Sequence, residues 1–259
     1  MLKLKVAVLA ASLTFAAQSQ ADVLELALVL DGSGSISTSD YELQLQGYRD
    51  IIASGSFWSD YVENSIYDSV HLATWQFSGT VVSEIGWTEI TSNAVADTFG
   101  NQFNTTDMAQ LNSSTNTSLA IDTVVASLIG NGIGGTGSDN MIIDISTDGN
   151  PNTGGGSAGA IAAADNARAA DVTINAIGVG SGIGSTFLEG LVGIDPIATP
   201  QGFFLTASNF SEFGSTLETK LDQEVRGGGP QAEVPEPASL ALLSIGLLGL
   251  RFRQNKKQA

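Results

Sequence analysis

The chain has 259 residues, no cysteine and a formal net charge of −17. The absence of cysteine excludes disulfides, a cysteine nucleophile and Cys-type zinc sites. The negative charge disfavours binding to nucleic acid or to anionic membranes.

The N-terminal end has the order of a cleavable export signal. Lys3 and Lys5 form a positive start, an apolar stretch follows, and a small-residue cleavage sequence ends at Ala21. We therefore predict a signal peptide over residues 1–21 and a mature chain that begins near Asp22. Such a chain is exported from the cytoplasm.

Between residues 22 and 225, apolar runs of strand length alternate with segments of helical periodicity. In chain order we first expect a buried strand over 23–30 and a helix that starts at the capping-box pattern 39–42 and continues to 52. Two strands over 70–77 and 80–87, joined by a hairpin turn, a weak helix over 92–103 and a helix over 118–129 follow. The remaining elements are a buried strand over 141–145, an Ala-rich helix over 158–170, strands over 172–179 and 202–205, and a closing helix over 211–225. This order predicts one domain with an α/β, doubly wound, Rossmann-like fold. Its sheet is mostly parallel with one antiparallel edge strand, and helices cover both faces.

Oxygen-bearing side chains gather at three of the predicted junctions. The first is Asp31-Gly-Ser-Gly-Ser35 after the first strand, the second is Ser113 to Thr117 before a helix, and the third is Ser146 to Gly149 after a buried strand. Open α/β sheets bind ligands at the carboxyl ends of their strands. Carboxylate and hydroxyl oxygens suit hard divalent cations. The sequence therefore indicates a metal site at this edge of the sheet.

The candidate ligands resemble the metal-ion-dependent adhesion site, or MIDAS, of von Willebrand factor type A domains. That site has the pattern Asp-x-Ser-x-Ser, a distant Thr and a later Asp-Gly, and all positions are present here in the same order. The resemblance covers residues 23–225. The segments Trp75 to Gly79 and Asp171 to Asn175 are similar to sequences that recur in a bacterial subgroup of this fold. The five matching residues are Asp31, Ser33, Ser35, Thr115 and Asp148.

The resemblance implies how these residues act. Ser33 and Ser35, and sometimes Thr115, would bind the metal directly, while Asp31 and Asp148 would reach it through water. The metal would be Mg²⁺, or alternatively Mn²⁺ or Ca²⁺. Its open position would accept a carboxylate from a protein or matrix partner.

The C-terminal end has a motif, an apolar run and a basic end, in that order. Pro235-Glu-Pro237 precedes an apolar run over 240–250, and four Lys or Arg residues follow it. This order resembles the PEP-CTERM sorting tail of Gram-negative bacteria that make extracellular polysaccharide, where an exosortase acts on the Pro-Glu-Pro motif. The apolar run is shorter than the ~20 residues of a transmembrane helix, so we expect a transient anchor. A plain C-terminal membrane anchor would show the same order. We assign 226–234 to a flexible linker and 235–259 to the sorting segment.

Three functions remain in competition. The first is an exported, non-enzymatic binding module of the cell surface or extracellular matrix that works through its metal. The second is a polysaccharide hydrolase with two catalytic carboxylates, and the third is a structural matrix protein that makes no use of the metal.

Between residues 22 and 234, the sequence has four basic and 26 acidic residues, which give a formal charge of −22. A Ser-His hydrolase is disfavoured, because the one histidine, His71, precedes the Gly-x-Ser-x-Gly sequence at 155–159.

Overall fold

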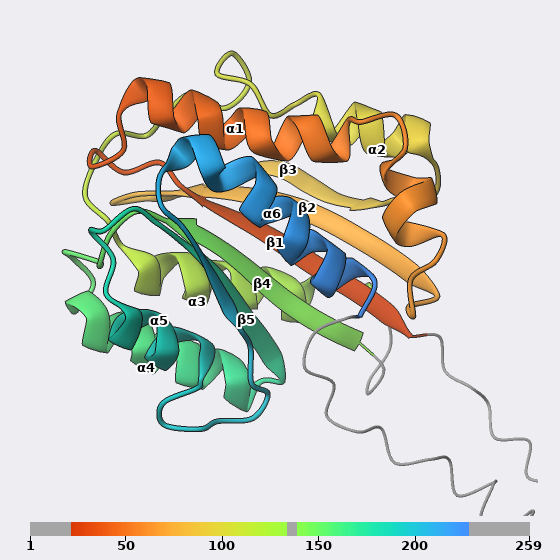
Figure 1. The fold of residues 1–259 in the computed structure, drawn as a ribbon. Coiled ribbons are helices and arrows are strands. Elements are labelled where there is room, and N and C mark those ends of the chain that lie inside the picture. The colour runs from red at the N-terminus through yellow and green to blue at the C-terminus, as the bar shows by residue number, and fades with distance from the viewer. Residues whose placement is uncertain (1–21, 134–138, 228–259) are drawn as a thin grey trace, which may run out of the picture.

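The computed structural model describes residues 22–133 and 139–227, which form a six-stranded sheet with helices on both faces (Figure 1). The strand order is β3-β2-β1-β4-β5-β6. The β2–β3 pair is antiparallel, and the other pairs are parallel. The predicted fold class is therefore confirmed, including its antiparallel edge strand. The elements are β1 (Val23–Asp31), α1 (Thr38–Ile52), η1 (Trp58–Val62), β2 (Ser69–Phe77), β3 (Val81–Glu89), α2 (Asn93–Gly100), α3 (Thr117–Gly130), β4 (Asp139–Thr147), α4 (Gly156–Ala169), β5 (Val172–Val179), α5 (Ser185–Val192), β6 (Phe204–Ala207) and α6 (Phe210–Val225).

Strand β1 lies inside the sheet, and all nine of its residues are buried. It pairs in parallel with β2 on one side and with β4 on the other. After β1 the chain first builds outward through β2 and β3, and it later returns to add β4 on the opposite side. The strand order thus reverses between β1 and β4, and ligands of open α/β sheets bind at the carboxyl ends of strands at such a point.

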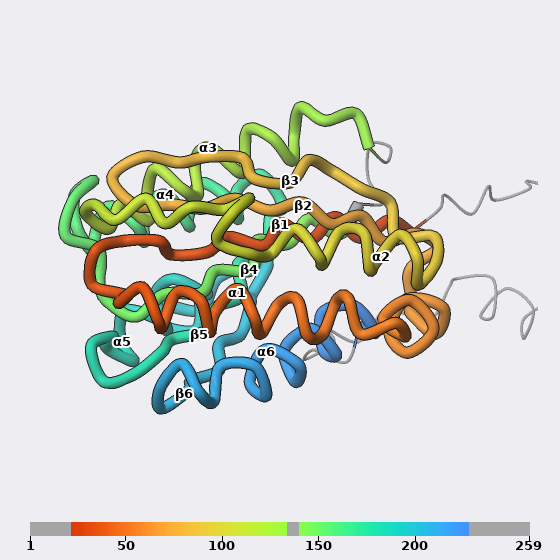
Figure 2. Tube along the Cα trace, turned by 90° about the horizontal axis from the view of Figure 1, so that it is seen from above, coloured from red at the N-terminus to blue at the C-terminus, as the bar shows by residue number. Residues whose placement is uncertain are grey.

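Alternate side chains of β1 enter two separate cores, as the period of a strand requires. Leu26 and Leu28 belong to the core that includes residues of α1, α2 and α6, whereas Ala27 and Val29 belong to the core that includes residues of α3, α4 and α5. Figure 2 shows α1 and α6 on one side of β1 and β2, with α3 on the other. A strand buried on both faces must be apolar at nearly every position, which explains the nearly continuous apolar run over residues 23–30, where Glu25 is the exception.

Several predicted boundaries differ from the observed ones. Helix α2 ends at Gly100, three residues early, and β6 begins at Phe204, two residues late. A side chain on Gly202 would overlap the carbonyl oxygen of Ile174, so this glycine lets the chain pass close to β5 before β6 begins.

The sequence-based prediction omitted two elements, η1 and α5. Helix α5 is only eight residues long, and its N-cap, Gly184, makes no side-chain capping hydrogen bond. Without a Ser, Thr, Asp or Asn cap, the usual sequence signal of a helix start is missing.

The predicted signal peptide and sorting segment lie outside the described residues. Within residues 22–133 and 139–227, no helix combines the length and the apolar character that crossing a bilayer would require.

Helices α1 and α6 approach each other closely at Gly47. A Cβ atom at this position would lie 2.9 Å from Cδ1 of Phe213 and 3.3 Å from the Cα of Gly214. The Phe213 ring is fully buried, with its centroid 5.6 Å from that of the tilted Tyr48 ring, so moving it aside would disturb the core. The missing side chain at Gly47 is therefore a packing requirement of the α1–α6 contact.

We predict that Gly47→Ala lowers the free energy of unfolding by about 1–3 kcal/mol, the usual cost of overpacking a core. The matched control is Gly130→Ala in α3, where a Cβ would meet no atom within 4 Å. That variant should be neutral or more stable, because alanine favours helix over glycine. Urea unfolding of both variants measures the difference, and equal midpoints would contradict the close contact.

Candidate metal centre

Three loops far apart in the chain meet beyond the carboxyl ends of β1 and β4. Gly34 N donates to the carbonyl oxygen of Ser113 at 2.7 Å, and Asn112 N donates to that of Gly32 at 2.8 Å. The loop after β4 joins the same group, since Asn152 N donates to the carbonyl oxygen of Thr115 at 3.1 Å. These backbone bonds bring together the three segments that the sequence singled out. We call this region the rim.

Asp31 is the most buried acid of the rim, with 0% of its surface exposed. Its Oδ1 accepts a hydrogen bond from Ser33 N at 2.8 Å, and its Oδ2 accepts one from Thr147 Oγ1 at 2.6 Å. Burial raises the pKa of Asp31 to about 6, although the hydrogen bonds from Ser33 and Thr147 act in the opposite direction. These hydrogen bonds fix the position of the carboxylate, but both donors are neutral and do not cancel its charge.

Ser33, Ser35 and Asp148 continue the network across the rim. The two serine hydroxyls lie 3.0 Å apart, and Ser35 Oγ donates to Asp148 Oδ1 at 2.7 Å. Desolvation also raises the pKa of Asp148. The charged neighbours that act on the two rim acids are themselves acidic: Asp148 acts on Asp31, and Asp40 acts on Asp148. Four of the five predicted ligands are therefore linked in one network with uncompensated negative charge.

Thr115, the fifth predicted ligand, is 4% exposed and is placed by its backbone. Its amide donates to Asn152 Oδ1 at 3.0 Å, and its carbonyl oxygen accepts from Asn152 N and Thr153 N. Within the described part of the chain, its hydroxyl has no hydrogen-bond partner, so its lone pairs are available to a ligand. The structure puts Thr115 in the adjoining loop but does not bond its side chain to the other four residues.

Side-chain amides that the sequence analysis did not identify support the loops of the rim. Gln44 Nε2 donates to the carbonyl oxygen of Asp31 at 3.0 Å, and Gln76 Oε1 accepts from Leu111 N at 2.7 Å. Gln110 Nε2 donates to the carbonyl oxygens of Ser33 and Ile36 at 3.2 and 2.9 Å. A glutamine on the buried face of a predicted helix, as at Gln44, was the one available signal.

The donor set fits a hard divalent cation. In the described residues, no three His, Cys, Asp or Glu side chains converge in a way that could hold a metal. The donors that the rim offers are the hydroxyl groups of Ser33, Ser35 and Thr115 and the carboxyl groups of Asp31 and Asp148. Such an all-oxygen set is typical of Mg²⁺, Mn²⁺ or Ca²⁺ sites.

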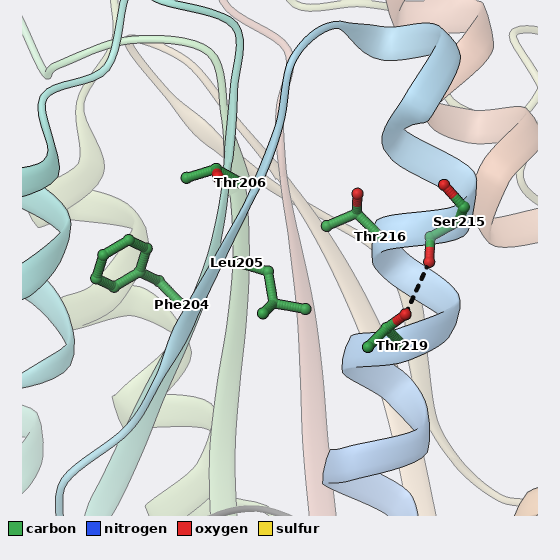
Figure 3. A pocket seen from close by; sticks show the side chains of 6 residues that line it. All are labelled: Phe204, Leu205, Thr206, Ser215, Thr216 and Thr219. Carbon is green, nitrogen blue, oxygen red and sulfur yellow. Dashed lines mark hydrogen bonds between the residues drawn. The ribbon is translucent and has the colours of Figure 1, made fainter.

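A hollow of about 500 Å³ lies between β6 and α6, away from the rim (Figure 3). The residues that line it carry no charge, and the helix hydroxyls donate back into α6, as Thr219 Oγ1 does to the carbonyl oxygen of Ser215 at 3.1 Å. Hydrolysis of a glycosidic bond ordinarily uses a pair of carboxylic acids. This hollow therefore gives no support to the hydrolase alternative. Its lining residues are Phe204, Leu205, Thr206, Ser215, Thr216 and Thr219.

Two family models match the chain. The model described as "Protein of unknown function (DUF1194)" matches residues 21–229, and the PEP-CTERM protein-sorting motif matches residues 233–257. A search of curated proteins gave no significant match.

Solved structures of von Willebrand factor A type are similar in fold. Proximal thread matrix protein 1 of the mussel byssus, with a zinc-occupied MIDAS motif, is 23% identical with a TM-score of 0.59, covering 79% of this chain and 48% of its own. Manganese-loaded TRAP protein of Plasmodium vivax is 18% identical with a TM-score of 0.52, covering 77% and 74%. A von Willebrand factor type A protein from Catenulispora acidiphila is 13% identical with a TM-score of 0.54, covering 79% and 43%.

The present chain spans about half the length of the mussel protein. At these identities the likeness shows the fold alone. Together with the tail motif, it confirms the predicted resemblance to a von Willebrand factor A-like protein with a PEP-CTERM tail.

We predict that millimolar Mg²⁺ raises the thermal unfolding temperature of the chain and that Asp31→Asn largely abolishes the rise. A ligand that binds only the folded state stabilises it by ~2.7 kcal/mol at a hundredfold excess over its Kd. Differential scanning calorimetry with Mg²⁺ and with chelator measures the effect.

The matched control is Asp122→Asn, which removes the same charge from an exposed position on α3. It should keep the full response to Mg²⁺. An equal response in all three proteins would mean that the cation acts by screening the acidic surface and not by binding at the rim.

Proposed function

We propose, on the premise that the chain belongs to the DUF1194 family of proteins of unknown function and has a von Willebrand factor A-type fold, that it is an exported binding module whose rim holds a divalent cation. The observation that carries this proposal is the network of Asp31, Ser33, Ser35 and Asp148, whose negative charge has no basic partner among the described residues. We assign no catalytic role to these residues.

The residues of the rim would bind the cation and would leave it able to bind a further ligand. By resemblance to the MIDAS pattern, Ser33 and Ser35 would bind the metal directly, and the unpartnered hydroxyl of Thr115 is suited to join them. Asp31 and Asp148 would act through water. Because neutral hydroxyls do not cancel the charge of the ion, the metal would remain able to accept one carboxylate from a partner. We favour Mg²⁺, with Mn²⁺ and Ca²⁺ as alternatives.

The position of the rim suits presentation from a surface. The start of β1 and the end of α6 lie at the end of the sheet opposite the rim, because β1 runs toward the rim and α6 runs back from it (Figure 1). The sorting motif over residues 233–257 follows α6 after a short intervening segment. While the chain is transiently anchored through its tail, it would therefore expose the rim on the side away from the membrane.

Export and tail processing complete the proposal. The sorting motif supports a location at the cell surface or outside the cell, after transient anchoring in the inner membrane of a Gram-negative bacterium. An exosortase would process the tail. The partner would be a protein or a matrix component that offers a carboxylate.

We predict that the double variant Ser33→Ala, Thr115→Ala loses partner binding without loss of fold, since each change removes a metal ligand without opening a core cavity. The partner is first recovered with Mg²⁺ from the surface fraction of the source bacterium, and surface plasmon resonance then measures its binding. Chelator should reproduce the effect of the variant, and moderate salt should weaken binding little because it also screens the repulsion between acidic surfaces.

Thr123→Ala is the matched control, because it removes an exposed hydroxyl that only donates back to the carbonyl oxygen of Leu119. This variant should bind as the wild type does. Undiminished binding by the folded double variant in chelator would overturn the metal-dependent function.

We predict that the tail is removed during export. Mass spectrometry of the surface-exposed or released protein should detect no peptide beyond about Pro237. Recovery of the basic peptides of residues 251–259 from mature extracellular protein would instead indicate a permanent C-terminal anchor.

A further inference from the structure

A charged cluster is sealed in the core between α6, β4 and β5, separate from the rim. Lys220 and Asp144 are 0% exposed and Glu224 is 2% exposed. The Lys220 ammonium contacts Asp144 Oδ1 directly and lies 2.7 Å from Glu224 Oε1. Asn175 Nδ2 donates to the same Glu224 oxygen at 2.7 Å. The metal-binding proposal makes no use of these groups.

If all three side chains of the cluster were ionised, their charges would not cancel. Two carboxylic groups face a single ammonium, and buried ions are costly unless they are paired and fully hydrogen-bonded. Among the described residues, neither oxygen of Asp144 accepts a hydrogen bond of ordinary geometry, so the approach of Lys220 is its one direct polar contact. A buried carboxylate with so few partners requires an explanation.

We propose that Lys220 and Asp144 condense to form an isopeptide bond that joins α6 covalently to β4, with Glu224 as the proton carrier. The Nζ atom of Lys220 attacks Cγ of Asp144. A nitrogen–carbon bond forms, the bond from Cγ to one carboxyl oxygen breaks, and that oxygen leaves as water. Ammonium and carboxylate thus give amide and water, so the reaction needs neither an oxidant nor a cofactor.

Glu224 is placed to move the protons that this reaction displaces. Burial and the nearby Asp144 together raise its pKa to about 8, although Lys220 and the hydrogen bond from Asn175 act in the opposite direction, so the group holds a proton at neutral pH. At 2.7 Å from the attacking nitrogen, it is within the reach expected of a general acid or base. It can give its proton to the departing carboxyl oxygen of Asp144 and then take one from the Lys220 nitrogen, so it ends the reaction protonated as it began.

The surroundings favour the condensed product. Phe203 lies beside the cluster, with its ring centroid 5.9 Å from Lys220 Nζ, and Tyr48 of α1 is fully buried near Asp144. An environment without bulk water favours the neutral amine and acid over the separated ions. It also deprives the reverse reaction of its water. Condensation removes two charges from the core and leaves the protonated Glu224 beside Asn175.

A covalent link at this place would serve a chain that has no cysteine. Disulfides are unavailable to it, and α6 is the last element before the sorting motif. If the rim binds a partner while the chain is still anchored through its tail, before processing, force passes through α6, and a bond to β4 would keep the helix attached to the sheet. This last consequence rests on the proposed function, whereas the bond itself does not.

Mass spectrometry of the denatured full chain tests the bond. The expected mass is lower than that of the sequence by one water. Trypsin should fail to cleave after Lys220, and the fragment 169–226 should be recovered joined to the fragment 50–168. The full mass with cleavage after Lys220 would overturn the proposal. Loss of ammonia with a link that maps to Asn175 would overturn the assignment to Asp144.

Variants separate this bond from water loss elsewhere in the chain. Glu224→Gln keeps the size of the side chain but carries no transferable acid proton, so it should give the full mass. Lys220→Arg keeps the positive charge and should also remain unlinked, while any dehydration at Asp148-Gly149 would persist in it. Circular dichroism establishes whether each variant folds. The wild-type mass decides the proposal even where a variant does not.

Discussion

The desolvated carboxylate of Asp31 is the constraint on which the rest of this structure depends. It stands at the end of a strand that is buried on both faces, where water cannot solvate it. Its two oxygens are therefore satisfied by Ser33 of its own loop and by Thr147 of β4, which ties the ends of the two central strands together. The hydrogen bonds hold the charge in position without neutralising it. A cation at the rim would complete the arrangement, and this need links the fold to the proposed function.

Much of this fold follows from the sequence, for reasons that are visible in particular elements. The nearly continuous apolar run of β1 predicts a central strand, and the turn at Ser78-Gly79 predicts the antiparallel edge. Helix α5 was missed because glycine replaces a polar cap at its start. The strand β6 was placed two residues early because the close approach at Gly202 depends on a neighbouring strand.

The candidate site was predictable only in part. The motif named Asp31, Ser33, Ser35 and Asp148, and the structure joins them by hydrogen bonds, because parallel strands end at the same edge of the sheet. Their supports, such as Gln44 and Gln76, come from elements whose contact with the loops exists only in three dimensions. The pairing of Lys220 with Asp144 was equally hidden, since distant residues of β4 and α6 form it.

The central claim is that the rim binds a metal through its hydroxyl groups, and a crystal structure with Mn²⁺ tests it most directly. Anomalous scattering locates manganese without reference to the protein model. We expect one strong peak within bonding distance of Ser33 Oγ and Ser35 Oγ, with Asp31 and Asp148 separated from it by water. Peaks confined to exposed carboxylates elsewhere on the acidic surface, with none at the rim, would contradict the account.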